Sequence, residues 1–179
     1  VKDQQANNLI FSYGDSDDLF GQPLLIELTE STESVQIFYE TTSKSEALDW
    51  LVPSQTAGKD YPFMYTQGQS IFTRSWIPIQ DSPGLRITYS ADIEVPENMM
   101  ALMSAANPQK LDSSNVYHFE MNQPLSPYLI ALAVGNLEFK SNLARIACNV
   151  RFQSIRKPLL QKNTDYLKYF KIRVKCLKQ

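Results

Sequence analysis

Few residues of this chain have the chemistry to bind a metal or activate water. A catalytic zinc site usually takes two or three histidines together with carboxylates. The sequence holds one histidine, His118, with no partner ligand at metal spacing. The two cysteines, Cys148 and Cys176, are too few for a disulfide framework, and we interpret them as reduced thiols without a role. The sequence therefore predicts no metal site and no catalytic residue, and His118 is interpreted as structural.

Two pairs of side chains allow other chemistry. Arg74 and Asp81 flank a turn rich in proline and could form a charged pair at a cleft. We favour a structural pair that pins the turn, which would contribute at most about 1 kcal/mol if exposed and more if desolvated. Trp50 and Trp76 could form an aromatic platform for a sugar ring, but packing in the core is the favoured interpretation.

The elements that must position these side chains are mostly predicted as β-strands. Residues 85–93 alternate between apolar and polar side chains, which is the period of a half-buried strand. Residues 128–134 are continuously apolar, which is typical of a central strand buried on both faces. Runs of β-branched and aromatic residues predict further strands. The expected strands are residues 23–28, 34–40, 69–77, 85–95, 115–121 and 128–134.

The connecting segments complete the prediction of an all-β fold. Residues 45–51 predict a short helical turn ended by Pro53. Residues 53–68 predict a loop, and residues 78–84 predict a turn. Because spacings are short and helical periods are scarce, we expect an antiparallel, multi-sheet domain that is saddle- or sandwich-like.

The net charge of the two parts of the chain differs in sign, and the change falls near residue 140. Residues 1–139 carry 6 basic and 18 acidic side chains, a net charge of −12, whereas residues 140–179 carry 11 basic and 1 acidic, a net charge of +10. Apolar residues in the second segment fit neither the helical nor the strand period, so a C-terminal tail of uncertain structure is expected. The eleven basic residues of segment 140–179 suggest phosphate contacts, but the acidic remainder of the chain would repel a nucleic acid, so no such partner is expected.

An ordered series of stretches resembles the family of aminopeptidase N and leukotriene A(4) hydrolase, closest to the leukotriene hydrolase branch. The strongest runs from Gln67 to Tyr89, where Q-x-Q leads through R-x-x-x-P-x-Q-D-x-P into a strand. Four further stretches are similar to the branch, at residues 39–51, 53–59, 95–105 and 127–135. Neither the H-E-x-x-H nor the G-x-M-E-N motif of the family occurs in the chain.

This resemblance implies a domain and a role. Residues 1–140 would be the β-rich N-terminal domain of a zinc aminopeptidase, incomplete at its start and without the catalytic domain. Residues 141–179 would be an unrelated basic tail, for which a shifted reading frame or an artificial end is favoured over a lineage-specific extension. The zinc would belong to the parent enzyme, and this chain would be inactive.

The resemblance also places three residues at one edge of the substrate cleft, where they would contact the N-terminus of a peptide. They are Gln69, Gln67 and Ser70, of which Ser70 departs from the small apolar residue of the family. A glutamine amide can accept from an ammonium group and donate to a carbonyl. The alternative for these residues is a purely structural role at a strand end, bonded to backbone.

The whole chain also permits an alternative function. A standalone β-sandwich that binds carbohydrate or another protein remains open at this point. The composition, with 43% hydrophobic and 20% charged residues, is ordinary for a globular protein. The chain has no apolar run of about 18 residues and its N-terminus has no signal-peptide pattern. We therefore expect a cytoplasmic protein without a membrane partner.

Overall fold

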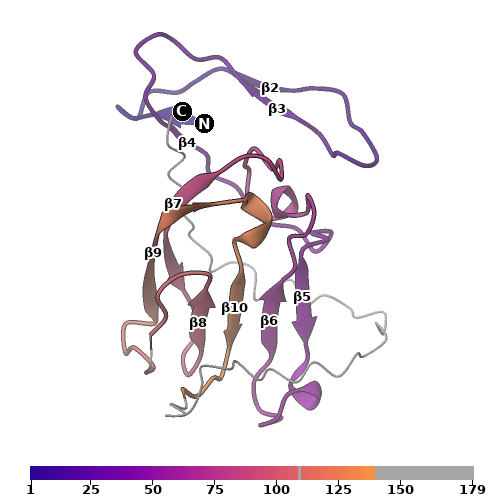
Figure 1. The fold of residues 1–179 in the computed structure, drawn as a ribbon, viewed down its shortest axis with the longest axis vertical. Helices are drawn as coiled ribbons and strands as arrows, with labels where there is room; N and C mark the ends of the chain where they lie inside the picture. Colours follow the sequence, from indigo (N-terminus) through magenta and orange to yellow (C-terminus); the bar gives the residue numbers. More distant parts are fainter. Residues whose placement is uncertain (109, 140–179) are drawn as a thin grey trace. The chain divides into compact units, whose positions relative to one another are not determined.

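The computed structural model describes residues 1–108 and 110–139, which divide into two units, residues 1–40 and the residues from Thr41 onward (Figure 1). The expectations for residues 141–179, including both cysteines, lie outside the described residues. No described helix is long and apolar enough to cross a membrane.

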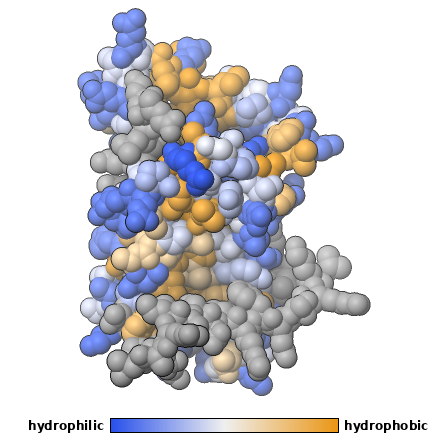
Figure 2. Space-filling view, viewed as in Figure 1, coloured by the Kyte–Doolittle hydropathy of each residue, from blue (hydrophilic) through white to orange (hydrophobic). Residues whose placement is uncertain are grey.

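The first unit consists of two short antiparallel strand pairs. Strand β1 (Lys2–Asp3) pairs with β4 (Val35–Gln36), and β2 (Phe11–Tyr13) pairs with β3 (Leu24–Ile26). Many of its large apolar side chains are exposed, and Figure 2 shows orange atoms at the top of the view. The exposed set in this unit is Ile10, Phe11, Tyr13, Leu19, Phe20, Leu25, Leu28, Val35, Phe38 and Tyr39.

The second unit contains a four-stranded antiparallel sheet in the order β5-β6-β10-β8. Its strands are β5 (Leu48–Leu51), β6 (Phe63–Thr66), β8 (Met100–Met103) and β10 (Leu132–Gly135). Strand β10 lies between β6 and β8, and the side chains of Leu132 and Val134 are buried. The central position expected from the apolar run is therefore confirmed, but burial on both faces is not, because Ala133 on the other face is only half-buried. Residues 127–129 form a short 3₁₀ turn, η3 (Pro127–Leu129), before the strand begins.

A second sheet of this unit is the long antiparallel pair of β7 (Ile87–Glu94) and β9 (Val116–Leu125). Burial alternates along β7, as the sequence period predicts. The inward residues join the core with residues of the other sheet. Its buried members include Ala47, Leu48, Met64, Trp76, Ile77, Ile87, Tyr89, Ala91, Ile93, Met100, Ala101, Tyr117, Phe119, Ile130, Leu132 and Val134. The described residues thus form several antiparallel sheets, and the all-β class is confirmed.

Three local predictions are wrong. Residues 45–51 contain strand β5 instead of a helical turn, and the expected loop 53–68 contains both β6 and a single 3₁₀ turn, η1 (Pro53–Gln55). Pairing between β5 and β6 buries Leu48 and Met64, so packing overrides the local preference. The expected strand 69–77 is a turn followed by the 3₁₀ turn η2 (Thr73–Ser75).

The buried phenol of Tyr89 on β7 leads to a pH-dependent prediction. Burial raises the pKa of this phenol, and its 3.0 Å hydrogen bond to Ser104 Oγ offsets part of the rise. Since the folded pKa exceeds the unfolded one, this contribution to stability is complete below about pH 10 and is lost as the pH rises through the raised pKa. We expect the free energy of unfolding to fall more steeply with alkaline pH in the wild type than in Tyr89→Phe. Urea denaturation at a series of alkaline pH values measures this, and equal slopes would contradict it.

Candidate functional site

The turn that follows β6 carries the three residues expected at the cleft. Gln67, Gln69 and Ser70 are all exposed, and the peptide bond between Gln69 and Ser70 is cis. The Gln67 side chain bends back, since its Oε1 accepts a 3.1 Å hydrogen bond from the backbone N–H of Gln69. The Gln69 side chain makes no hydrogen bond with the residues that the structure describes. The Gln67 oxygen is therefore engaged within the turn, whereas both the oxygen and the nitrogen of the Gln69 amide are available to a ligand.

Gly68 allows this turn to lie close to η3. A methyl group at Gly68 would lie 2.7 Å from Thr73 Oγ1, 3.0 Å from the carbonyl oxygen of Tyr128 and 3.2 Å from its Cα. The first distance is shorter than a Cβ atom tolerates, and the other two are tight contacts with backbone that cannot rotate away. Glycine is therefore required here by close approach, and its carbonyl accepts a 2.9 Å hydrogen bond from Phe72 N–H.

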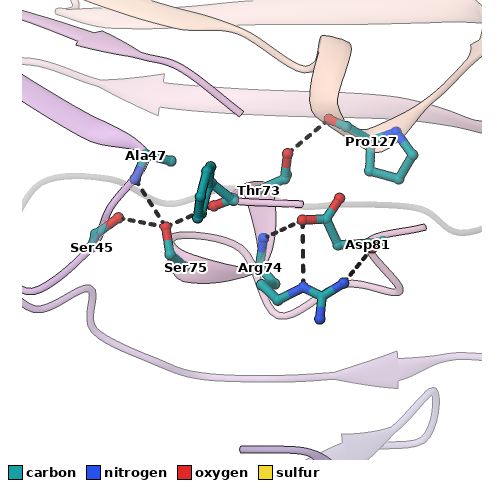
Figure 3. A network of polar contacts seen from close by, with 8 residues as sticks. Ser45, Ala47, Thr73, Arg74, Ser75, Asp81 and Pro127 are labelled. Atoms are coloured by element: carbon teal, nitrogen blue, oxygen red, sulfur yellow. Dashed lines mark hydrogen bonds and ion pairs between the residues drawn. The ribbon is translucent and has the colours of Figure 1, made fainter. Parts of the chain in front are cut away.

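The far end of the turn is anchored by Thr73, which is completely buried. Its hydroxyl donates to the carbonyl oxygen of Pro127 at 3.1 Å (Figure 3). A buried hydroxyl without a partner would cost free energy, so this bond both satisfies Thr73 and ties η2 to η3. The turn is consequently held against η3, the segment that precedes β10.

Arg74 and Asp81 are brought together by the structure. Backbone N–H of Arg74 donates to Asp81 Oδ2 at 3.0 Å, and the side-chain nitrogen Nε lies 3.6 Å from the same oxygen. The guanidinium also donates to the carbonyl oxygen of Asp81 (Figure 3). The Asp81 side chain is fully buried, whereas that of Arg74 is 32% exposed. This geometry closes the loop between the two residues and places no carboxylate oxygen at an open surface.

His118 lies opposite Asp92 in the β7–β9 pair, and its Nδ1 is 2.6 Å from Asp92 Oδ1. Both side chains are exposed. Within residues 1–108 and 110–139 there is no group of three or more histidine, cysteine, aspartate or glutamate side chains that could hold a metal ion. The described residues therefore do not fit a zinc ion.

The two tryptophans pack in the core. Trp76 is 3% exposed, and Trp50 is partly buried against the same core. A sugar ring cannot stack on the buried indole of Trp76, so the two indoles do not form an aromatic platform. The favoured interpretation of core packing is confirmed.

The sequence did not predict the roles of Gly68, Thr73 and Ser75 in holding this turn. A glycine between two glutamines after an apolar run is a signal for close backbone approach. The hydroxyl residues carry no comparable signal, because their partners are distant in the sequence.

Comparison with known proteins gives a consistent result. The profile of the family described as Peptidase M1 N-terminal domain matches residues 15–129. Leukotriene A-4 hydrolase of Xenopus laevis is 41% identical over 138 residues, which cover 72% of this chain and 23% of that protein. Aminopeptidase B of Homo sapiens is 40% identical over 122 residues, which cover 66% of this chain and 19% of that protein. The chain thus spans less than a quarter of the length of these relatives.

Solved structures agree with the sequence relatives. The native yeast LTA4 hydrolase has a TM-score of 0.60 and 29% identity, over 73% of this chain and 20% of that one. The yeast LTA4 hydrolase in complex with bestatin has a TM-score of 0.62 and 27% identity, over 74% of this chain and 21% of that one.

Proposed function

Because the chain belongs to the family of M1 peptidase N-terminal domains, we propose that it forms one wall of the substrate cleft in a zinc-dependent aminopeptidase. The complete enzyme would release N-terminal residues from peptides. This chain would supply binding contacts and structural support. The support for this proposal is the similarity to leukotriene A-4 hydrolase and aminopeptidase B. No observation favours the alternative of a standalone carbohydrate- or protein-binding module.

The single observation that carries the binding role is the Gln69 amide. It is exposed on a turn whose backbone is held on both sides, by the Gln67 side chain and by the Gly68 carbonyl. A neutral amide can accept a hydrogen bond from the ammonium group of a peptide without neutralising the carboxylates that would bind the same amine. We assign Gln69 this role, with Gln67 and Ser70 as secondary contacts.

Metal chemistry in the proposed enzyme would depend on residues beyond the described part of this chain. His118 is bonded to Asp92 and no third ligand group lies beside them among the described residues. We therefore propose that a separate catalytic domain holds the zinc, and that residues 1–140 form the N-terminal domain with residues 141–179 as a distinct basic segment. The Arg74–Asp81 pair is proposed to support the turn without touching substrate.

A kinetic experiment tests the role of Gln69. The longest reading frame that contains this sequence is expressed, and hydrolysis of an aminoacyl p-nitroanilide is followed. Gln69→Ala should raise KM about tenfold, because a hydrogen bond to a charged group is lost. Gln36→Ala, which removes an exposed glutamine of β4, should leave KM unchanged.

Two outcomes would refute the proposal. The first is an equal KM for Gln69→Ala and the wild type. The second is a genomic sequence in which no reading frame downstream of this stretch encodes H-E-x-x-H within a few hundred residues, since the zinc ligands of the proposed enzyme would then have no source.

A further inference from the structure

The hydroxyl of Ser75 lies at a node of the polar network shown in Figure 3. Its Oγ donates to the carbonyl oxygen of Phe72 at 2.7 Å and accepts from the backbone N–H of Ala47 at 3.1 Å. The hydroxyl of Ser45 lies 2.9 Å away. A serine hydroxyl has one proton and two lone pairs. Because the Ser75 proton is used on Phe72, Ser45 must be the donor of the third bond, and Ser75 is then fully satisfied.

This node reaches both ends of the turn that carries Gln69. On one side, the carbonyl of Ala47 accepts from the backbone N–H of Gln67 at 2.8 Å, so a single residue links Ser75 to the start of the turn. On the other side, Phe72 donates its N–H to the carbonyl of Gly68 at 2.9 Å. The segment before β5, the turn after β6 and η2 are therefore tied together through one hydroxyl.

We propose that Ser75 is a positioning residue for Gln69: its hydroxyl holds both flanks of the turn and so fixes the backbone from which the substrate-binding amide projects. This inference rests on the proposed function of Gln69. Ser75 itself is only half-exposed, and all its bonds run to the protein. Its effect on substrate is consequently indirect.

Amide hydrogen exchange of the full chain tests the first step without any substrate. Ser75→Ala should speed exchange about five- to tenfold at the amide of Ala47, which loses its acceptor. Exchange should also speed up, by a smaller factor, at the amides of Gln67 and Phe72, whose bonds to Ala47 and Gly68 lose their support. The amides of β7 and β9 should not change. Ser54→Ala, which removes an exposed hydroxyl from η1, is the matched control and should change none of these amides. Unchanged exchange at all three in Ser75→Ala would overturn the inference.

A double-mutant cycle in the aminopeptidase assay tests the second step. Ser75→Ala should raise KM severalfold in the wild type but have no further effect in the Gln69→Ala background, because it acts through that side chain. Ser75→Thr retains the hydroxyl and should restore the wild-type KM. If Ser75→Ala does not fold, Ser45→Ala removes one donor to the node and takes its place in the cycle.

The outcomes separate the inference from the proposed function. A raised KM for Gln69→Ala with an unchanged KM for Ser75→Ala overturns the inference alone. An equal rise for Ser75→Ala in both backgrounds also overturns it, since the effect then bypasses Gln69. An unchanged KM for Gln69→Ala overturns both.

Discussion

Asp81→Ala is expected to lower the free energy of unfolding of the full chain by about 3 kcal/mol. The Asp81 carboxylate is fully buried, and its Oδ2 accepts a hydrogen bond from the backbone N–H of Arg74 and lies 3.6 Å from the Arg74 Nε. Truncation removes the acceptor for that N–H and leaves the guanidinium beside an apolar gap. The cost combines the lost ion pair with the loss of the acceptor for the Arg74 backbone N–H, while the guanidinium, which is 32% exposed, keeps part of its hydration. Equilibrium denaturation in urea provides the measurement.

The exposed pair of Asp92 and His118 is the natural control for this prediction. Both pairs join a carboxylate to a nitrogen base, but Asp92 and His118 are 42% and 76% exposed. Asp92→Ala should therefore change the free energy of unfolding by at most about 1 kcal/mol. Asp81→Asn, which retains an acceptor for the Arg74 N–H, should fall between the two. A smaller loss for Asp81→Ala than for Asp92→Ala would show that the buried pair does not pin the turn.

The parts of the fold that were predictable from sequence are those with a local period. Residues 85–95 alternate strictly and form β7, and residues 115–121 begin β9, which runs on to Leu125. The continuous apolar run at 128–134 located the central strand β10. In each case the order of apolar and polar residues within the strand predicts which side chains are buried, so no knowledge of the partner strand is needed.

The misassigned segments depend on partners that are distant in sequence. Strands β5 and β6 stabilise each other, and β6 is held on its other side by β10. Strand β8 was not foreseen, and its pairing with β10 spans roughly thirty residues of sequence. The apolar residues near Ile71 favoured a strand, but the chain turns there because Gly68 permits close contact with Tyr128. Tertiary contacts, and not local propensity, thus determine the secondary structure of these segments.

The residues of the candidate site were also predictable from the sequence only in part. Gln67, Gln69 and Ser70 came from the resemblance to a family and not from any pattern of their own. The Arg74–Asp81 pairing was foreseeable, because two opposite charges flank a short turn. The Ser45–Ser75 contact was not, since it joins residues 30 positions apart and serines occur throughout the chain.

Gly68→Ala is expected to destabilise the full chain by about 2–3 kcal/mol, through overpacking of a site with no free volume. The new methyl group would overlap Thr73 Oγ1 at 2.7 Å and would make tight contacts with two backbone atoms of Tyr128 at 3.0 and 3.2 Å. Thr73 is fully buried and bonded to Pro127, so it cannot move without breaking that bond. Because Gly68 does not adopt a positive φ, alanine is conformationally acceptable there. The whole effect therefore comes from the close approach and none from backbone strain.

Gly84→Ala separates this cause from a general intolerance of glycine substitution. A methyl group at Gly84 would meet no atom within 4 Å, and this residue also lacks a positive φ. The change in free energy of unfolding should stay within about 0.5 kcal/mol. Since the two variants add the same methyl group to turns of the same unit, their difference in urea denaturation measures the packing between the Gln67–Phe72 turn and η3. Equal stability of the two variants would mean that the turn can move away from Tyr128 at little cost, and that the backbone that carries Gln69 is not held in a fixed position.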